Sequence, residues 1–405
     1  MAAVVQAALT DTRVVVINGP RQSGKSTLVG LLARERSAEW RNLDSDVQRN
    51  AAVADPTGFV ESDGLMVIDE IQRVPELLLA IKQQVDSDPR PGRYLLTGSA
   101  RVLGLRALPD TLPGRTETVE LWPFSQGEVD GTADGFVDAV FREGPELRHT
   151  SELSRTGYAE RIVRGGFPEA VARTAPERRS RFLDSYVGDL ITRDVSLLSE
   201  IERPREMRAL LGLLAGRSAQ LLVANTLAND LRLSARSVHR YLALLEEVFL
   251  VKRIPAWSRH VSARAIGTPK LAFVDSGVAA DLLDVDVRSL LRPGGPIGPL
   301  LEGFVLAELA RQLSWSSRRV ELSHYRTKDG VEVDAVLEDR RGGVVGIEVK
   351  ASSTVRAEDF RGLRHLADRI GDDLIAGLVL YTGTETLPFG GRMRAMPVSA
   401  LWQLS

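Results

Sequence analysis

The stretch that decides the fold is Gly19-Pro20-Arg21-Gln22-Ser23-Gly24-Lys25-Ser26-Thr27. It matches the phosphate-binding pattern G-x-x-x-x-G-K-[ST]. Residues 13–18 before it are apolar and β-branched, as in a buried parallel strand, and residues 28–36 after it carry apolar side chains at helical spacing. Strand, glycine loop and helix start therefore follow in the order that phosphate binding needs. This context argues against the alternative, a chance match in a glycine-rich turn.

Each part of this loop has an expected chemical role. The glycines let backbone N–H groups close around phosphates, and the helix N-terminus adds partial positive charge. Lys25 is expected to reach the β- and γ-phosphates, and the Ser26 hydroxyl to bind Mg²⁺. The sequence therefore predicts a nucleotide site.

Length and composition narrow the class of protein. A chain of 405 residues predicts two to four domains, and 43% hydrophobic with 26% charged residues is typical of a globular protein. No apolar run approaches the ~20 residues that span a bilayer, and residues 1–10 lack the basic start of a signal peptide. The absence of cysteine excludes disulfides and suits a cytoplasmic protein. The net charge of −2 gives no overall indication of a nucleic-acid partner.

A second motif of nucleotide chemistry lies at residues 64–70, Gly-Leu-Met-Val-Ile-Asp-Glu. An apolar strand that ends in Asp-Glu is typical of a Walker B strand. We expect Asp69 to hold Mg²⁺ and Glu70 to orient and deprotonate the attacking water. The alternative is an acidic strand end that caps the next helix. The position downstream of Lys25 and before an amphipathic helix favours the catalytic interpretation.

Two further features bear on ATP chemistry. The next expected strand, 93–99, ends in hydroxyl residues, and Thr97 and Ser99 are both candidates for sensing the γ-phosphate. Arg115 precedes an expected strand at 117–121, where an arginine finger could reach the site of a neighbouring subunit in a homo-oligomer. A surface turn residue is the alternative for Arg115. Four other arginines compete for the finger role: Arg21, Arg73, Arg101 and Arg106.

These motifs carry a family resemblance. A strand between the two motifs and a Glu directly after the Walker B Asp resemble the AAA+ branch of P-loop ATPases, and ATP is favoured over GTP because no N-K-x-D appears. The segments 19–26, 67–72 and 95–99 together resemble prokaryotic ATPases whose AAA+ module is fused to a C-terminal domain of unknown function. The resemblance extends to Gly-Gly-Phe-Pro-Glu at 165–169 and to Lys-Leu-Ala-Phe-Val-Asp-Ser-Gly at 270–277. It implies an α/β AAA+ core at 1–124, a helical lid at 125–216, and ATP with Mg²⁺ as cofactors.

The segment 217–264 has helix-turn-helix patterning. Expected helices at 226–231 and 235–248 precede an expected strand at 249–254, as in a winged helix. The second helix should bury Val238, Tyr241, Leu242, Leu244 and Leu245. Residues 203–264 hold eleven Lys or Arg against four Asp or Glu, which indicates contact with a DNA backbone. A packing or protein-interaction module is the alternative.

The C-terminal part, 265–405, contains a second cluster of candidate residues. A Gly/Pro-rich bridge at 292–299 leads into an expected helix, and strands are expected at 331–337 and 344–350. If those strands pair as a hairpin, Asp334, Glu348 and Lys350 converge at one end.

That trio resembles the restriction-endonuclease-like PD-(D/E)xK fold, with Val333 in place of the proline. The resemblance implies that Asp334 and Glu348 bind Mg²⁺ together with a helical glutamate, Glu302 or Glu308, and that Lys350 positions or activates water. The domain would then contribute to DNA contact or cleavage. An exposed charged hairpin, or a decayed nuclease fold retained for binding, are the alternatives.

Two functions follow from the sequence. The first is a Mg²⁺-dependent AAA+ ATPase that couples ATP hydrolysis to nucleic-acid binding or processing. The second is an ATP-dependent regulatory switch whose nuclease-like domain is not catalytic.

Overall fold

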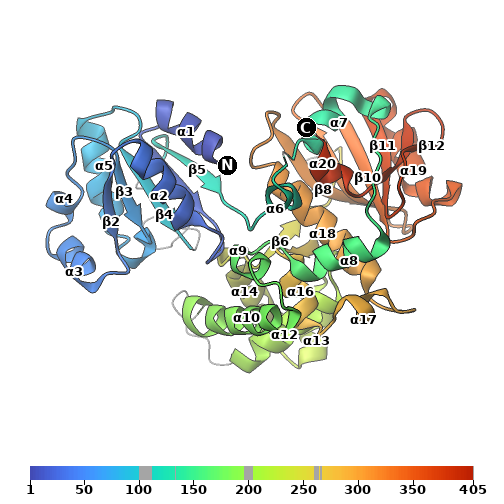
Figure 1. The fold of residues 1–405 in the computed structure, drawn as a ribbon, viewed down its shortest axis with the longest axis horizontal. Coiled ribbons are helices and arrows are strands. Elements are labelled where there is room, and N and C mark those ends of the chain that lie inside the picture. Colours follow the sequence, from blue (N-terminus) through green and yellow to red (C-terminus); the bar gives the residue numbers. More distant parts are fainter. Residues whose placement is uncertain (100–111, 133, 196–203, 260–263, 265–266, 405) are drawn as a thin grey trace. The chain divides into compact units, whose positions relative to one another are not determined.

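The computed structural model describes residues 1–99, 112–132, 134–195, 204–259, 264 and 267–404 (Figure 1). The chain forms two compact units. The first comprises residues 1–123 with 247–249, and the second comprises 124–246 with 250–405. The end of the first unit lies close to the predicted boundary at residue 124, and the predicted lid, winged-helix-like and C-terminal segments lie almost wholly in the second unit. Arg101 and Arg106, two of the competing finger candidates, lie outside the described residues.

The first unit is built on a five-stranded parallel sheet in the order β2-β3-β4-β1-β5. The strands are β1 (Val14–Asn18), β2 (Glu39–Asn42), β3 (Met66–Asp69), β4 (Tyr94–Gly98) and β5 (Thr116–Glu120). The helices are α1 (Ala2–Asp11), α2 (Lys25–Glu35), α3 (Asp46–Ala54), α4 (Pro56–Phe59), η1 (Ile71–Arg73) and α5 (Leu77–Ser87). The strands expected from the two phosphate motifs, β1 and β3, therefore lie in one parallel α/β sheet, with β4 between them.

Alternation along the central strand produces two apolar layers. Every residue of β1 is buried. Val14 and Val16 join the core cluster that contains the apolar face of α5, whereas Val15 and Ile17 join the cluster that contains residues of α1 and α2. Because successive side chains of a strand point to opposite faces, both faces of this sheet are covered by helices. The phosphate loop follows the carboxyl end of β1, and Asp69 is the last residue of β3.

The second unit begins with a series of helices. They are α6 (Gln126–Asp130), α7 (Phe136–Glu143), η3 (Gly144–Glu146), α8 (Arg155–Arg164), α9 (Pro168–Val171), α10 (Pro176–Asp189), η4 (Leu190–Asp194), α12 (Pro204–Gly216), α13 (Ala224–Leu231) and α14 (Ala235–Glu247). The five residues expected on the buried face of α14 are all buried. A two-stranded antiparallel sheet follows, β6 (Val251–Ile254) with β7 (Lys270–Phe273). Helices α16 (Ser276–Leu282) and α17 (Val287–Leu291) come next.

Two segments singled out in the sequence meet in this unit. Asp275, at the N-terminus of α16, is fully buried and accepts a hydrogen bond of 2.6 Å from the backbone amide of Gly166. A Cβ atom at Gly166 would lie 2.1 Å from the Phe124 carbonyl oxygen, so only glycine fits there. The segments 165–169 and 270–277 are therefore structural partners.

The C-terminal part of the second unit is a six-stranded mixed sheet in the order β12-β13-β11-β10-β9-β8. Its strands are β8 (Val320–Arg326), β9 (Glu332–Asp339), β10 (Val344–Lys350), β11 (Leu374–Tyr381), β12 (Leu387–Pro388) and β13 (Met393–Pro397). Its helices are α18 (Ile297–Gln312), η5 (Ala357–Phe360), α19 (Arg361–Ile370), η6 (Gly371–Asp373) and α20 (Ala400–Gln403). Strands β8, β9 and β10 form an antiparallel meander. Strand β11 pairs parallel with β10, and the connection between these two strands contains α19. The predicted β9–β10 hairpin is confirmed.

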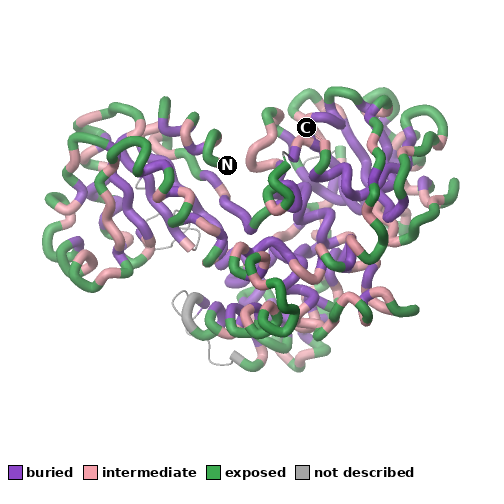
Figure 2. Tube along the Cα trace, in the orientation of Figure 1, coloured by how far each residue is buried: buried purple, intermediate pink, exposed green. Residues whose placement is uncertain are grey.

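Helices cover both faces of this sheet. Gly346 of β10 lies against Leu363 and Leu366 of α19, where a Cβ atom would crowd both side chains. Helix α18 is almost wholly buried, and Figure 2 shows the strands of the sheet buried along most of their length, except for the short edge strand β12, which is exposed. Polar side chains enclosed between these layers need partners of their own.

Candidate functional site

The phosphate loop leads directly from β1 into α2. Gly24 forms the N-cap of α2 with φ +97°, a conformation that side-chain-bearing residues rarely adopt. A Cβ atom at Gly19 would lie 2.1 Å from the carbonyl oxygen of Leu121. Both glycines are therefore required by the path of the backbone, and this path places the loop at the amino end of a helix.

Lys25 lies within the curve of its own loop. It is 5% exposed, and its Nζ donates hydrogen bonds to the carbonyl oxygens of Gly19, at 2.9 Å, and Pro20, at 2.7 Å. An ammonium group held over the loop lies where phosphate oxygens are bound in P-loop proteins. The neighbouring Ser26 donates its hydroxyl to Asp69 Oδ1 at 3.2 Å.

The carboxyl end of β4 completes the polar cluster. The Thr97 hydroxyl donates to Asp69 Oδ1 and accepts a hydrogen bond from the Glu70 backbone amide at 3.1 Å. Ser99 donates to Glu70 Oε2 at 3.3 Å and accepts from Gln72 at 2.9 Å, and Gln72 also donates to that Glu70 oxygen. The structure therefore brings each hydroxyl candidate to one acidic side chain, Thr97 to Asp69 and Ser99 to Glu70, and Thr97 also holds the Glu70 amide.

Glu70 is held in a strained backbone conformation. Its φ of 60° and ψ of 45° are left-handed, which is uncommon for residues other than glycine. Burial raises the pKa of Glu70, and the charge of Lys25 opposes this rise. A half-buried carboxylate with a raised pKa is a stronger base than an exposed glutamate, which suits it to accept a proton.

The loop fits the phosphates of a nucleotide. The Ser23 hydroxyl, which can donate to a phosphate oxygen, is buried and has no hydrogen-bond partner among the described residues. Buried polar atoms normally have partners, so the loop has free bonding capacity. Together with Lys25 and the N-terminus of α2, the set matches a bound polyphosphate, and Ser26 with Asp69 offers oxygen ligands for its Mg²⁺.

Arg115 lies at the opposite end of the strands from the phosphate loop. Its carbonyl oxygen accepts from the amide of Val14, at the amino end of β1, whereas the phosphate loop follows the carboxyl end. Its guanidinium forms a two-pronged ion pair with Asp86, with distances of 2.5 and 3.1 Å. Another finger candidate, Arg73, pairs with Asp44 at 3.1 Å. A role for Arg115 in a neighbouring subunit remains a prediction.

The C-terminal candidates form a second buried cluster. The Asp334 Oδ2 atom of β9 accepts from the Val349 amide of β10 at 3.0 Å. Lys350 Nζ donates to Glu348 Oε1 at 2.8 Å. The predicted convergence of Asp334, Glu348 and Lys350 is therefore present.

A residue with no role predicted from the sequence lies at the centre of this cluster. Lys270, at the start of β7, donates from Nζ to Glu302 Oε1 at 2.6 Å and to Asp334 Oδ1 at 2.9 Å. Its side chain is only 5% exposed. Glu302 is therefore the helical glutamate of the cluster. The other candidate, Glu308, is fully buried elsewhere, with Arg311 and the Gln126 amide as its partners.

Charge explains how these groups titrate. Burial by itself lowers the pKa of Lys270, but the charges of Asp334 and Glu302 outweigh it, and the pKa is raised above its ordinary value. Burial and the charge of Asp334 raise the pKa of both Glu302 and Glu348. Three carboxyl groups share the site with two ammonium groups, so one negative charge is left over and favours retention of a proton. Among the residues that the structure describes, no group of three or more His, Asp or Glu is arranged to hold a metal ion.

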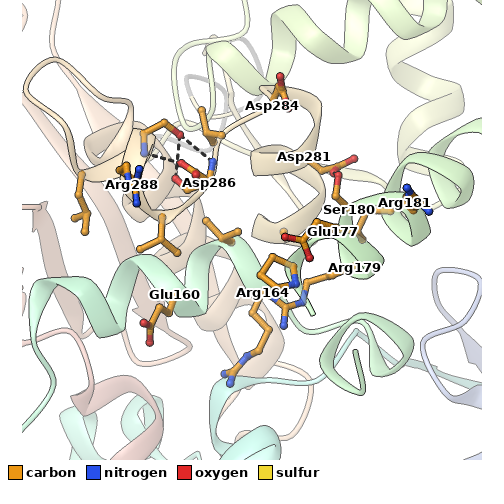
Figure 3. Close-up of a pocket in the computed structure, with 18 of the residues that line it drawn as sticks. Glu160, Arg164, Glu177, Arg179, Ser180, Arg181, Asp281, Asp284, Asp286 and Arg288 are labelled. Atoms are coloured by element: carbon orange, nitrogen blue, oxygen red, sulfur yellow. Dashed lines mark hydrogen bonds between the residues drawn. The ribbon is translucent and has the colours of Figure 1, made fainter. Parts of the chain in front are cut away.

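The second unit also contains a cavity of about 1360 Å³, lined by α8, α10, α16, α17 and the segments beside them (Figure 3). Its lining carries charges of both signs, and several are used by the fold. Asp281 accepts from Ser180 at 2.7 Å, and Asp286 caps α17 through Ser289.

In the described part of the chain, no helix has the length and hydropathy required to cross a bilayer.

Comparisons with known proteins agree with the first site. Residues 11–130 match the family model of an AAA domain, whereas residues 155–289 and 297–401 match two domains of unknown function, DUF8612 and DUF4143. Uncharacterized proteins of Mycobacterium tuberculosis and Mycobacterium bovis are each 29% identical over 406 residues, which is 99% of this chain and 83% of theirs.

Similar solved structures share only a coarse likeness. A Walker-type ATPase of Pyrococcus abyssi is 17% identical with a TM-score of 0.43, covering 69% of this chain and 94% of that one. A RuvB variant of Thermotoga maritima is 20% identical with a TM-score of 0.28, covering 63% and 85%. These scores are too low to assign any function. The AAA match and the loop geometry together support an ATP-binding protein with an AAA-type core.

Proposed function

We propose that this protein is a Mg²⁺-dependent ATPase. The observation that carries the proposal is the hydrogen-bonded chain from Ser26 through Asp69 to Thr97, with the Glu70 amide on the same threonine. It joins the phosphate loop, the Walker B strand and the adjacent strand in one polar cluster. Such a cluster can bind a nucleotide and prepare water for attack on it.

The residues would divide the work as follows. Lys25 and the loop amides would bind and orient the phosphates, and Thr97 would fix Asp69 while its other hydrogen bond positions Glu70. Glu70 would hold the attacking water and accept its proton. When bound, Mg²⁺ at Ser26 and Asp69 would neutralise charge on the phosphates.

We further propose that ATP turnover is coupled to nucleic-acid binding by the second unit. The support is the face of α14 opposite its apolar side, where Arg236, His239 and Arg240 are exposed. Basic side chains on one exposed helix face suit contacts to a phosphate backbone. Some of the local basic residues are already paired, as Arg253 is with Glu246 at 2.9 Å. The alternative is an ATP-dependent switch that acts on a protein partner.

The ATPase and the ATP-dependent switch differ in whether bound ATP is hydrolysed. Phosphate release from ATP should be measured for the wild type, Lys25→Ala and Glu70→Gln, with Lys328→Ala as a control at an exposed lysine of the other unit. We expect turnover in the wild type and the control only. ATP binding without turnover in the wild type would favour the switch.

A further inference from the structure

The cluster formed by residues of β7, α18, β9 and β10 contains the buried ammonium group of a lysine. Lys270 reaches it from a segment 64 residues before Asp334, and its Nζ lies 2.6 Å from one carboxylate and 2.9 Å from another. These are the distances of charge-assisted hydrogen bonds. The ammonium is enclosed, since the lysine side chain is almost fully buried.

We propose that Lys270 takes the place of a divalent cation in this cluster, so that the C-terminal domain holds its carboxylates without a metal. The resemblance of Asp334, Glu348 and Lys350 to a metal-dependent nuclease implies an ion bound by Asp334, Glu348 and Glu302. The structure assigns two of those carboxylates to the lysine. The proposal concerns a different site from the ATPase and does not depend on it.

The occupied oxygen atoms carry the argument. Mg²⁺ requires oxygen ligands at about 2.0–2.1 Å in near-octahedral geometry. Lys270 uses Glu302 Oε1 and Asp334 Oδ1, and the second oxygen of Asp334 is taken by the Val349 amide. An ion bound between the same two oxygens would have to displace the ammonium. Displacement would then leave a buried lysine without its partners, which is costly.

The remaining carboxylate follows the same pattern. Glu348 Oε1 accepts from Lys350 at 2.8 Å, so a second ammonium neutralises the other side of the cluster. Glu348 Oε2 is buried and has no hydrogen-bond partner among the described residues. This oxygen offers an ion a single ligand, because both oxygens of Asp334 and Oε1 of Glu302 already have partners.

The cluster also joins separate parts of the second unit. Lys270 begins a strand paired with β6, Glu302 belongs to α18, and Asp334 belongs to the six-stranded sheet. The ammonium therefore connects the small sheet and the helix to the C-terminal sheet. A metal-free cluster of this kind has a structural role that does not vary with the supply of divalent ions.

The test uses the 405-residue chain without nucleotide and with Asp69→Asn, which removes the Walker B carboxylate. Mn²⁺ binding is measured by electron paramagnetic resonance and by calorimetry. We expect no bound Mn²⁺ in this Asp69→Asn protein. If this protein binds an ion and adding Glu348→Gln abolishes the binding, the cluster holds a metal while Lys270 is still present. That result would overturn the proposal.

Removal of the lysine provides the converse result. In the same background, Lys270→Met should create a site for a single Mn²⁺ ion, and adding Asp334→Asn should abolish it. Lys328→Met, at an exposed turn, is the matched control and should bind none. If Lys270→Met unfolds, Mn²⁺ should restore its far-ultraviolet circular dichroism, and failure of both binding and restoration would contradict the proposal. ATP turnover of the otherwise wild-type chain is measured separately, so failure of the two proposals can be distinguished.

Discussion

Thr97 on β4 donates its hydroxyl hydrogen to Asp69 on β3, and the same oxygen accepts the backbone amide hydrogen of Glu70. The threonine is completely buried. One side chain therefore fixes both acidic residues of the Walker B strand relative to each other. Ser99 contacts only the Glu70 side chain among these acids. The two hydroxyls, equivalent in the sequence, thus have different roles.

We expect Thr97→Val to impair the protein more than Ser99→Ala. Valine keeps the shape of threonine but removes one of the two hydroxyl donors of buried Asp69 and the acceptor of the Glu70 amide, which costs about 1–3 kcal/mol in the free energy of unfolding. Ser99→Ala should lower kcat with a smaller effect on stability, because Gln72 still donates to Glu70. Urea unfolding and ATP turnover of both variants check this expectation. Equal losses of stability in the two would contradict it.

The pH dependence of turnover should reflect Glu70. Burial raises its pKa, so as the pH falls this carboxylate takes up a proton sooner than an exposed glutamate would. A protonated Glu70 cannot act as the base, and kcat should therefore fall on the acid side of neutrality, at a pH above the ordinary glutamate value of 4.5. The pH profile of kcat measures this directly. A profile that is flat down to the ordinary value would argue against Glu70 as the base.

Two glycines near the phosphate loop should respond oppositely to alanine. At Gly19 the new Cβ atom would lie 2.1 Å from the Leu121 carbonyl oxygen, so the loop must move and nucleotide affinity should be lost. Gly30 lies within α2, and a Cβ atom there meets nothing within 4 Å. Gly30→Ala should therefore stabilise the chain by about 0.5–1 kcal/mol. Thermal unfolding and binding of a fluorescent ATP analogue distinguish these outcomes.

Nucleic-acid binding should depend on the exposed face of α14. Arg236→Ala should weaken binding of double-stranded DNA and lower the slope of log affinity against log salt by about 1 for a lost phosphate contact. The control is Arg90→Ala, an exposed arginine of the first unit that is paired with Asp88. Fluorescence anisotropy at several salt concentrations provides the measurement. An unchanged slope for Arg236→Ala would remove the support for DNA contact at this helix.

Local sequence was sufficient for the first site. The loop, Lys25, Asp69 and Glu70 all lie within short motifs whose order along the chain fixes their place at the ends of parallel strands. The pattern did not distinguish Thr97 from Ser99, because the choice depends on how β3 lies beside β4. Which side chain of one strand bonds to which residue of the neighbouring strand cannot be read from either strand alone.

The second cluster was only partly predictable. The hairpin of β9 and β10 is local, so Asp334, Glu348 and Lys350 could be brought together by alternation. Lys270 could not, because it comes from a distant strand of a different sheet. The sequence signal at this position was the segment 270–277, which begins with this lysine and was singled out for a family resemblance rather than for a chemical role. Glu302 and Glu308 were likewise separable only by their partners in the folded chain.

The most direct test of the central proposal is ATP turnover by the wild type and Glu70→Gln with Mg²⁺ present. Glutamine keeps the size of the side chain but cannot accept a proton, so it should reduce kcat by about 10²–10⁴-fold while ATP binding is retained. Lys25→Ala should instead weaken ATP binding itself. Mg²⁺-dependent turnover that is lost in Glu70→Gln is the predicted result. A wild type that binds ATP but does not hydrolyse it, or a Glu70→Gln variant with undiminished kcat, would contradict the assignment of this site as an ATPase.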